Sequence, residues 1–505
     1  MFAESPTLLI TAIAVASMLL VHVVCFGYWF KKWTGFDPSD TATKVCIVLG
    51  SGLTLLGIEV LGLGYVRALT VQAILAATVI VLLLLIPVRD KIFSNIKVCL
   101  TNLWILAHYN HFLSAACAIM FCLIVYSGLR PPIAGDELDY HLSAPFYWAQ
   151  NHQWVASPFR MTNGPAFMEI IYTFSAIFGS YISAHWTHTI FLVVLMAGCA
   201  ALAKRCGGHP LVSSAGVLSC PVIVNQASIA YNDVAAAALL VAGYCALFCG
   251  AHDETSGLPS RSSKIVALLL FAGAVSIKPL TLVGTLVAAI YCKQSFRPKA
   301  LAMIAVYLLP FLAVLALWSV HTYHLTGRFY AYPKLSTGIA RSSEDPNRTA
   351  AGRIPSLADV MTLPAVPIIT GIIGQDWPYR GRTGLIIAPF CAIAIWNLRR
   401  IPPRNKVNLL WLLLAAMAYL FILGPVFILT RYNIFVWALL LCIASVGYFV
   451  ANESKSDALR RLAVISYCLL TLVGMVDSAQ VIMIWPRSNL LPLRMQWQIQ
   501  NPVRL

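Results

Sequence analysis

Apolar residues fill most of this chain in long runs that short polar connections separate. A helix needs roughly 20 consecutive apolar residues to cross a membrane. Runs of this kind predict fourteen helical spans, at 7–30, 45–66, 68–88, 110–129, 185–203, 211–226, 231–250, 265–277, 279–292, 300–323, 383–398, 407–429, 432–451 and 462–483. Two short runs meet at Lys278-Pro279, which predicts a turn at the membrane surface. We therefore expect an all-α polytopic membrane protein with 12–14 spans.

The composition agrees with this pattern. Of the 505 residues, 59% are hydrophobic and 11% are charged, and the mean hydropathy is +0.79. Soluble domains carry about 25% charged residues, so this chain cannot cover a water-exposed surface. The first apolar run is followed by others and has no small-residue cleavage site, and we interpret it as a retained span rather than a signal peptide.

The net charge of +16 lies mainly in the connections. With the N-terminus outside, every connection on the inside holds at least two Lys or Arg residues, as the positive-inside rule requires. Apart from the C-terminal tail, the short outside turns hold only Arg67, Lys278 and Arg431. No basic helix or nucleic-acid motif is present, so we expect no nucleic-acid partner. The same alternation places two long segments outside, at about 130–184 and 324–382.

The first outer segment contains an acidic cluster, in the sequence GDELDYHLSAPFYW. Asp136, Glu137 and Asp139 lie close together and His141 follows them. One interpretation is helix capping, with Asp136 as N-cap and Asp139 at N3. The other is catalysis, because a carboxylate crowded by others has a raised pKa and accepts a proton near neutral pH. On a helix that starts at Asp136, residues 136 and 139 share one face, and residues 137 and 141 share the next.

Further polar residues fall on the same outer side. The candidates for substrate binding are Asp139, His141, Asp233, Lys278, Arg328, Asp376, Arg380, Arg382 and Arg431. Arg and Lys bind phosphate oxygens well. Acids together with these cations therefore predict a phosphate-bearing lipid substrate and an acceptor that a carboxylate activates. Asp233 also suits a helix N-cap, so both interpretations of this residue stay open.

Histidines and two short amphipathic segments complete the outer side. His185 and His188 are spaced by three, as are His321 and His324, which fits either a metal site or interfacial polar groups. A divalent cation such as Mg or Mn is an open alternative, and its ligands are unknown. Segments 141–150 and 165–178 predict helices that lie flat at the interface, with Glu169 on a solvated face.

Five motifs in this order resemble the GT-C superfamily of membrane glycosyltransferases. They are GDELDYHLSAPFYW, YNDVAAAALLVAGY, AGAVSIKPLTL, LTGRFYAYP and TRYNIFVWALLL. The Asp-Glu pair is also similar to that of protein O-mannosyltransferases and aminoarabinose transferases. The resemblance implies a GT-C-like fold and inverting transfer of a sugar from a polyprenyl-phosphate donor to a hydroxyl acceptor, which is a cell-envelope glycan, a lipid or a protein. It implies Asp136 as general base and a catalytic Glu137, with phosphate contacts among Lys278, Arg380, Arg382 and Arg431.

The resemblance also implies a domain organisation and a location. Residues 1–109 form extra N-terminal spans, 110–451 a catalytic core with both outer loops, and 452–505 the last span and a short outer tail. The family usually has one span before the catalytic loop, so the first three spans are candidates for contact with a membrane partner or with lipid. We expect a multi-pass protein of the bacterial inner membrane with its site on the periplasmic side.

Two other functions stay open. A transporter or flippase of a lipid-linked or anionic substrate would need charges deep within its spans and usually an internal repeat. The span cores are nearly free of charge and no repeat is evident. An O-antigen polymerase or ligase would act on the same side of the membrane, on a diphosphate-linked donor.

Overall fold

The computed structural model describes most of the chain. The described residues are 6–38, 40–132, 134, 136–156, 166–250, 259–293, 316, 320–324, 386–423 and 433–484. The longer helices among them are α1 (Pro6–Thr34), α2 (Thr41–Tyr65), α3 (Val71–Leu85), α4 (Arg89–Tyr109), α5 (His111–Ser127), α8 (Tyr181–Arg205), α11 (Asp233–Cys249), α12 (Arg261–Ile277), α13 (Leu282–Lys293), α19 (Pro403–Leu423), α20 (Ile434–Asn452) and α21 (Asp457–Ile484). The shorter ones are α6 (Ser143–Asn151), α7 (Phe167–Ala176), α9 (Pro210–Leu218), α10 (Pro221–Ala227) and α18 (Ile387–Trp396). Within these ranges no strand occurs, so the protein is helical, as predicted.

Seven helical stretches are long and apolar enough to cross a membrane. They are Pro6–Thr34, Thr41–Tyr65, Val71–Tyr109, Tyr181–Arg205, Pro403–Ile422, Ile434–Asn452 and Asp457–Gln480. Others that the sequence predicts as spans, among them α5 and α11, are shorter apolar helices. The described part is therefore that of a helical membrane protein.

Proline-containing breaks occur at two places, one within a predicted span and one between two predicted spans. The predicted span 211–226 is two helices, α9 and α10, which are bent by 74°. Pro221 begins α10, and a proline cannot donate the hydrogen bond that would continue α9. The predicted break at Lys278 is confirmed, because Lys278 ends α12 and a 3-10 helix from Pro279 to Thr281 leads into α13, and its place at the membrane surface stays a prediction.

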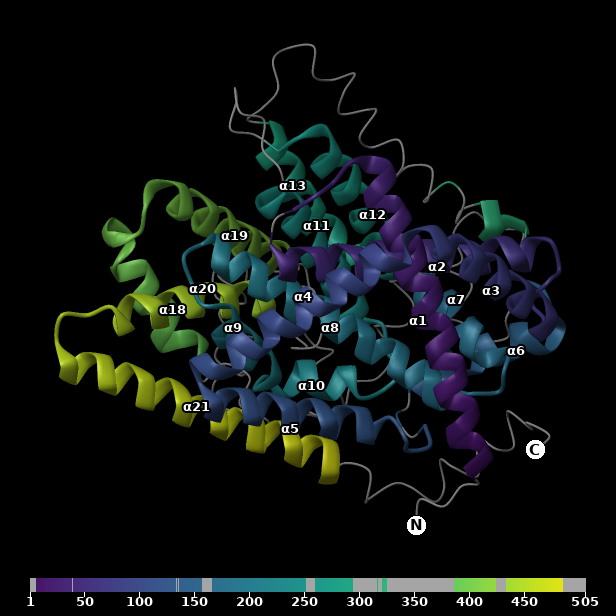
Figure 1. Cartoon of the computed structure of the whole chain (residues 1–505), viewed down its shortest axis with the longest axis horizontal. Coiled ribbons are helices and arrows are strands. Elements are labelled where there is room, and N and C mark those ends of the chain that lie inside the picture. Colours follow the sequence, from purple (N-terminus) through teal and green to yellow (C-terminus); the bar gives the residue numbers. More distant parts are fainter. Residues whose placement is uncertain are drawn as a thin grey trace, which may run out of the picture.

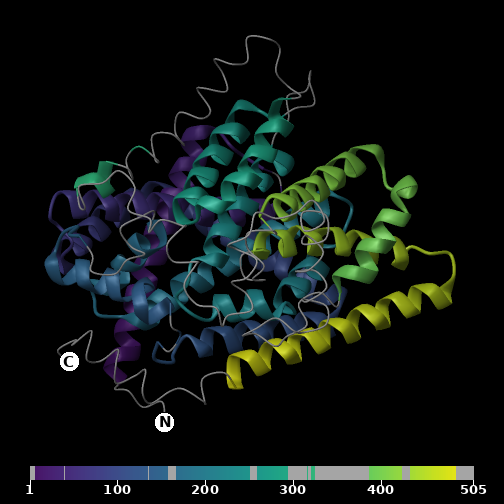
Figure 2. The same ribbon diagram turned by 180° about the vertical axis from the view of Figure 1, so that it is seen from behind.

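The core of the molecule surrounds α8 and α11, which pack against each other and against α2 and α20. All but one of the seventeen residues of α11 are buried, and small side chains from Ala235 to Ala238 allow its neighbours to approach closely. Figures 1 and 2 show α18 to α21 on one side of this core, and α2, α3 and α6 on the other.

The first two helices are part of the same core. Where α1 crosses α2, a Cβ atom added at Gly27 would overlap the backbone carbonyl of Val48, and one added at Gly52 would overlap that of Val23. Helices in membranes associate through small residues of this kind. Since α2 also packs against α7, α8, α11 and α12, the N-terminal helices are built into the helical bundle.

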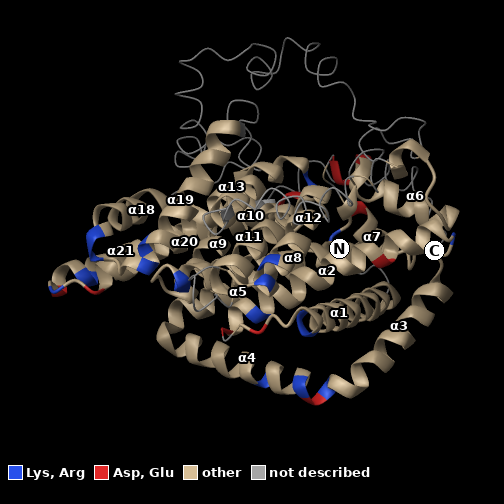
Figure 3. Ribbon diagram, turned by 90° about the horizontal axis from the view of Figure 1, so that it is seen from above, with Lys and Arg blue, Asp and Glu red and all other residues tan. Residues whose placement is uncertain are grey.

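The two ends of the bundle hold different groups of helix termini. At one end, Lys204 of α8 forms an ion pair with Asp40 at 3.0 Å, and Lys31 of α1 forms one with Asp37 at 2.7 Å. At the other end, the starts of α8 and α11 meet the end of α12. Figure 3 shows Lys and Arg residues spread along α21, α4 and the middle of the molecule with some acidic residues among them, and a further group of acidic residues near α6, α7 and α12. The predicted acidic segment contacts α8 near its start through His185, whereas Lys204 and Arg205 lie in the last turn of that helix.

Two segments differ from the expectation. The predicted basic connection after residue 88 is the helix α4, which has no buried residue and lies apart from the bundle in Figure 3. The helix α7, expected to be amphipathic at the interface, has all ten of its residues buried. It packs against α2, α6, α8 and α12, and these contacts replace the solvated face that the sequence predicts.

Candidate functional site

The acidic cluster forms one π-helical turn, Glu137–His141, that Asp136 precedes. We call residues 136–141 the acidic turn. Asp136 occupies the N-cap position, but its side chain makes no capping hydrogen bond. The predicted division into two faces is confirmed, because Glu137 and His141 are buried whereas Asp136 is partly exposed and Asp139 is exposed. Turns of π geometry inside helices occur frequently at functional sites.

Glu137 holds the acidic turn to the bundle. Its Oε1 atom lies 2.6 Å from Nε2 of His185 and accepts a hydrogen bond from the backbone N–H of Ala230 at 2.8 Å. Its Oε2 atom accepts one from the N–H of Ala134 at 3.3 Å. On the other side of the imidazole, Nδ1 of His185 donates to the carbonyl oxygen of Gly128 at 2.9 Å.

These contacts fix the orientation of the His185 ring. The carbonyl of Gly128 can only accept, so Nδ1 of His185 carries a proton, and Nε2 faces a carboxylate oxygen that already accepts a hydrogen bond. The contact between Nε2 and Oε1 therefore requires one proton that the two side chains share. The pair fixes the acidic turn to the starts of α8 and α11 and to the end of α5. This geometry gives Glu137 a positioning role.

His141 makes a second pair with a buried carboxylate. Its Nδ1 atom donates to Oε1 of Glu169 at 2.5 Å, and both side chains are buried. Its Nε2 atom forms no hydrogen bond with any of the described residues. A carboxylate that fixes the tautomer of a histidine in this way is the arrangement found in acid–base dyads. The expectation of a solvated Glu169 is wrong, because α7 is packed on all sides.

Aromatic residues surround this dyad. The ring of Tyr231 lies 5.1 Å from that of His141, and the hydroxyl of Tyr172 donates to the backbone carbonyl of Tyr231 at 2.6 Å. Burial, together with the nearby carboxylates of Glu169 and Glu137, raises the pKa of Tyr172 well above its ordinary value. The hydroxyl of Tyr172 therefore stays protonated and holds Tyr231 beside the dyad.

Asp139 lies on the exposed face of the turn. Partial burial, together with the negative charge of Asp136, raises the pKa of Asp139 above its ordinary value of 3.8. Neighbouring carboxylates raise each other's proton affinity because two negative charges close together repel. Asp139 therefore binds a proton more readily than an isolated Asp does.

The predicted substrate-binding residues Asp233 and Lys278 lie together. Nζ of Lys278, at the end of α12, donates to Oδ1 of Asp233, at the start of α11. Both side chains are largely buried, with 14% and 5% exposure. The N-cap interpretation of Asp233 is wrong, because Asn232 occupies that position and Asp233 is the first helical residue. Asp233 lies three positions after Ala230, whose backbone N–H donates to Glu137.

Arg130 is a cation near the acidic turn that is not among the residues predicted from the sequence. Arg130 follows α5, and its guanidinium donates to the carbonyls of Ser127 at 2.9 Å and Ile482 at 2.5 Å. Burial lowers the pKa of Arg130 to about 10, and the charge of Glu137 opposes this effect. The only signal in the sequence is its place six residues before Asp136. The candidates Arg328, Asp376, Arg380, Arg382 and Arg431 lie outside the described residues.

The two histidines of α8, His185 and His188, bind neighbouring segments of the site through hydrogen bonds. Both ring nitrogens of His185 are engaged, and Nδ1 of His188 donates to the carbonyl of Ile229 at 2.7 Å. In the part of the chain that the structure covers, no group of three or more His, Cys, Asp or Glu residues is arranged to hold a metal ion. A Mg or Mn ion stays a prediction without assigned ligands.

The family described as "Domain of unknown function (DUF8201)" matches residues 9–337, more than half of the chain. The chain belongs to this family. The DUF8201 match begins within α1 and includes the acidic turn, His185, Asp233 and Lys278. The N-terminal helices and the candidate site are thus parts of one family domain. No match was found among curated proteins or among solved structures.

Proposed function

We propose that this protein is a membrane glycosyltransferase of GT-C type, which transfers a sugar from a polyprenyl-phosphate donor to a hydroxyl acceptor. The observation that carries the proposal is the acidic turn. A buried pair, Glu137 and His185, holds it at one end of the bundle and leaves Asp136 and Asp139 on the accessible face. A fixed carboxylate at the end of membrane-embedded helices suits a substrate whose lipid part stays in the bilayer.

In the proposed reaction Asp136 is the general base. The acceptor oxygen forms a bond to the anomeric carbon of the sugar and its proton passes to Asp136. The bond between that carbon and the phosphate oxygen breaks on the opposite face, and the electron pair stays on the lipid phosphate. The configuration at the anomeric carbon is therefore inverted. Lys278, Arg380, Arg382 and Arg431 are the proposed contacts for the phosphate, since cations stabilise its developing charge.

The His141–Glu169 dyad has a supporting part in this proposal. Its free Nε2 atom lies on the turn that Asp136 begins, so it can accept a hydrogen bond from a substrate hydroxyl. Substrate binding is the role that we assign to His141. Asp139, with its raised pKa, is a second contact for substrate hydroxyls.

The finer topology is part of the same proposal. We assign a GT-C-like fold with 12–14 spans, with the site on the periplasmic side of a bacterial inner membrane. The acidic turn contacts the start of α8, whereas Lys204 and Arg205 end that helix, and this separation supports the orientation.

The test is donor turnover by the full chain in lipid nanodiscs. A set of polyprenyl-monophosphate hexoses and pentoses is supplied with acceptor membranes, and release of polyprenyl phosphate is measured. We expect release by the wild type, and a loss of about 10²–10⁴-fold in Asp136→Asn with donor binding retained. The matched control is Glu453→Gln, an exposed carboxylate after α20.

Three outcomes would contradict the proposal. Full turnover in Asp136→Asn would remove the assigned base. Consumption of a diphosphate-linked glycan, with no use of any monophosphate donor, would identify a polymerase or ligase. Movement of a labelled solute or lipid across the membrane without donor turnover would identify a transporter or flippase.

A further inference from the structure

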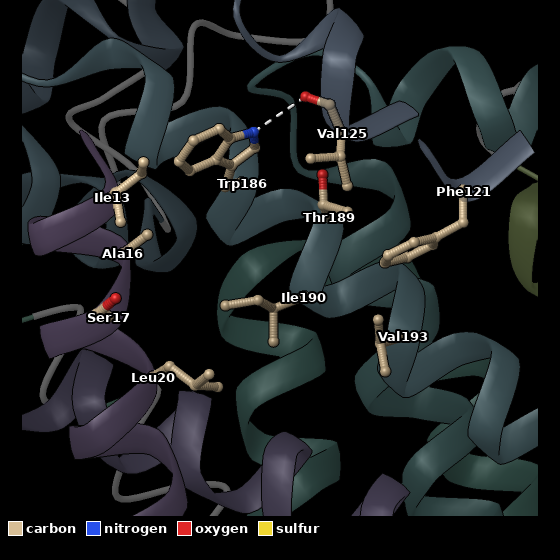
Figure 4. Close-up of a pocket in the computed structure, with 10 residues that line it drawn as sticks. All are labelled: Ile13, Ala16, Ser17, Leu20, Phe121, Val125, Trp186, Thr189, Ile190 and Val193. Carbon is tan, nitrogen blue, oxygen red and sulfur yellow. Dashed lines mark hydrogen bonds between the residues drawn. The ribbon is translucent and has the colours of Figure 1, made fainter. Parts of the chain in front are cut away.

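An apolar groove lies between α1, α5 and α8 and has a volume of about 300 Å³. Figure 4 shows the side chains of these three helices around it. Eight of its ten lining residues are apolar, none is charged, and the two polar ones are Ser17 and Thr189. The hydroxyl of Thr189 donates to the carbonyl of His185 in its own helix at 3.3 Å. The groove therefore offers hydrocarbon contact and almost no polar recognition.

The groove runs along the helices from the end that carries the candidate site. On α8 its lining extends from Trp186, near the start of the helix, to Val193. On α1 it extends from Ile13 to Leu20. Seven residues of helix rise by about 10 Å, which is about a third of the hydrocarbon thickness of a bilayer. The groove thus covers the part of a lipid chain that adjoins its headgroup.

The end of the groove is joined directly to the acidic turn. Nε1 of Trp186 donates to the carbonyl of Val125 at 3.0 Å, which ties α8 to α5 at this end (Figure 4). The preceding residue, His185, bonds both Gly128, after α5, and Glu137 in the acidic turn. A molecule whose chain lies in the groove therefore has its polar end at the level of these residues.

The shape of the groove selects its occupant. A volume of about 300 Å³ is at the lower end of the range for ligand pockets, and a packed helix about 10 Å across is too wide for it. Ile13 and Leu20 are 50% and 42% exposed, so the groove opens to the surface that faces the hydrocarbon of the bilayer. A single hydrocarbon chain fits these features.

We propose that this groove binds the hydrocarbon chain of the lipid on which the acidic turn acts. The inference rests on the proposed function for the identity of the headgroup, a phosphate that carries a sugar. It adds a chain-binding site that involves α1, one of the helices before the core that the resemblance covers. Trp186 then contacts the hydrocarbon chain of the lipid and, through Nε1, the carbonyl of Val125 near the end of α5.

The experiment measures binding of polyprenyl phosphates of increasing chain length to the full chain by native mass spectrometry. Ile190→Trp fills the groove, and Leu469→Trp is the matched control because Leu469 is 57% exposed on α21, outside the groove. The wild type and the control should bind longer chains more tightly. We expect Ile190→Trp to weaken binding of long-chain phosphates at least about tenfold, the effect of losing about two buried CH₂ groups, and to leave short-chain binding unchanged.

Cross-linking identifies the occupant independently. A polyprenyl phosphate with a diazirine in the isoprene units nearest the phosphate should label residues of the groove, and unlabelled polyprenyl phosphate should compete. The inference is overturned if Ile190→Trp shows the chain-length dependence of the wild type. It is also overturned if a diazirine phosphatidylglycerol labels the groove and polyprenyl phosphate does not compete, or if a second copy of the chain cross-links there.

The two proposals fail separately. Labelling and chain-length-dependent binding without any sugar transfer would support the groove as a lipid site and contradict the glycosyltransferase. Sugar transfer with the same chain-length dependence in the wild type and in Ile190→Trp would support the enzyme and contradict the groove.

Discussion

Nε2 of His185 lies 2.6 Å from Oε1 of Glu137, and both side chains are buried. The two residues are 48 positions apart, in α8 and in the acidic turn. The turn has only a short helical segment of its own, and this pair joins it to α8, in addition to the contacts with Ala230 and Glu169. The neighbouring Asp136 therefore has a defined position at the end of the bundle, which a solvated loop would not provide.

Breaking this pair should destabilise the protein. Glu137→Gln replaces the buried carboxylate that contacts Nε2 of His185, and removal of one partner of a buried pair costs about 3–5 kcal/mol. We expect a lower unfolding temperature in detergent for Glu137→Gln than for the control Glu453→Gln. The double variant Glu137→Gln/His185→Gln should lose less than the sum of the single variants. Additive losses would contradict a direct interaction.

The His141–Glu169 dyad should matter for turnover more than for folding. Glu169→Gln keeps the shape of the side chain but removes its negative charge, which weakens the hold on His141. We expect donor turnover to fall about tenfold or more, the effect of losing one substrate hydrogen bond of about 1.5 kcal/mol, with Glu169→Asp partly active, when each variant is assayed well below its own unfolding temperature. If Glu169→Gln lowers the unfolding temperature but leaves donor turnover unchanged, the dyad serves packing only.

The raised pKa of Asp139 gives a prediction about pH. In the unfolded chain the carboxyl loses its proton near 3.8, whereas in the folded protein it does so at higher pH. Between these values the folded state holds a proton that the unfolded state has released, so stability falls as pH rises through this window. Asp139→Asn removes that fall. Its unfolding temperature should match that of the wild type near pH 4 and exceed it near pH 7; a constant difference would contradict the shift.

The Asp233–Lys278 pair allows structural and binding roles to be separated. Lys278→Met or Asp233→Leu alone leaves a buried charge and should lower stability, while the double variant should recover much of it. If the pair serves packing only, the double variant keeps donor turnover. We expect turnover to be lost even in the stable double variant, because the lysine charge is proposed to contact the phosphate. Donor release by the purified variants is the measurement.

The close crossing of α1 and α2 predicts that alanine has opposite effects on stability at two glycines of α2. Gly52→Ala places a methyl group against the backbone of Val23, whereas nothing lies within 4 Å of a Cβ at Gly62. Gly52→Ala should separate the helices and lower the unfolding temperature. Gly62→Ala should raise it slightly, because alanine is favoured over glycine in a helix by up to about 1 kcal/mol. Equal effects would mean that the helices do not cross closely at Gly52.

The hydrophobic pattern predicted much of the architecture because it depends on local sequence. The apolar runs gave the helical class, the prolines and Lys278 marked the break between α12 and α13, and the spacing of the acidic turn predicted which residues share a face. The helix α4 was missed, because its polar residues read as a connection although the segment is helical throughout.

The partners of the site residues were decided by the tertiary structure. Glu169 looked like a solvated acid on an amphipathic segment, and nothing near it in the sequence identifies His141 as its partner. Glu137 and His185, or Asp233 and Lys278, meet only because helix packing brings the ends of α8, α11 and α12 together. Hydrophobicity along a chain determines which segments enter the membrane, whereas the pairing of polar groups depends on how the helices pack in three dimensions.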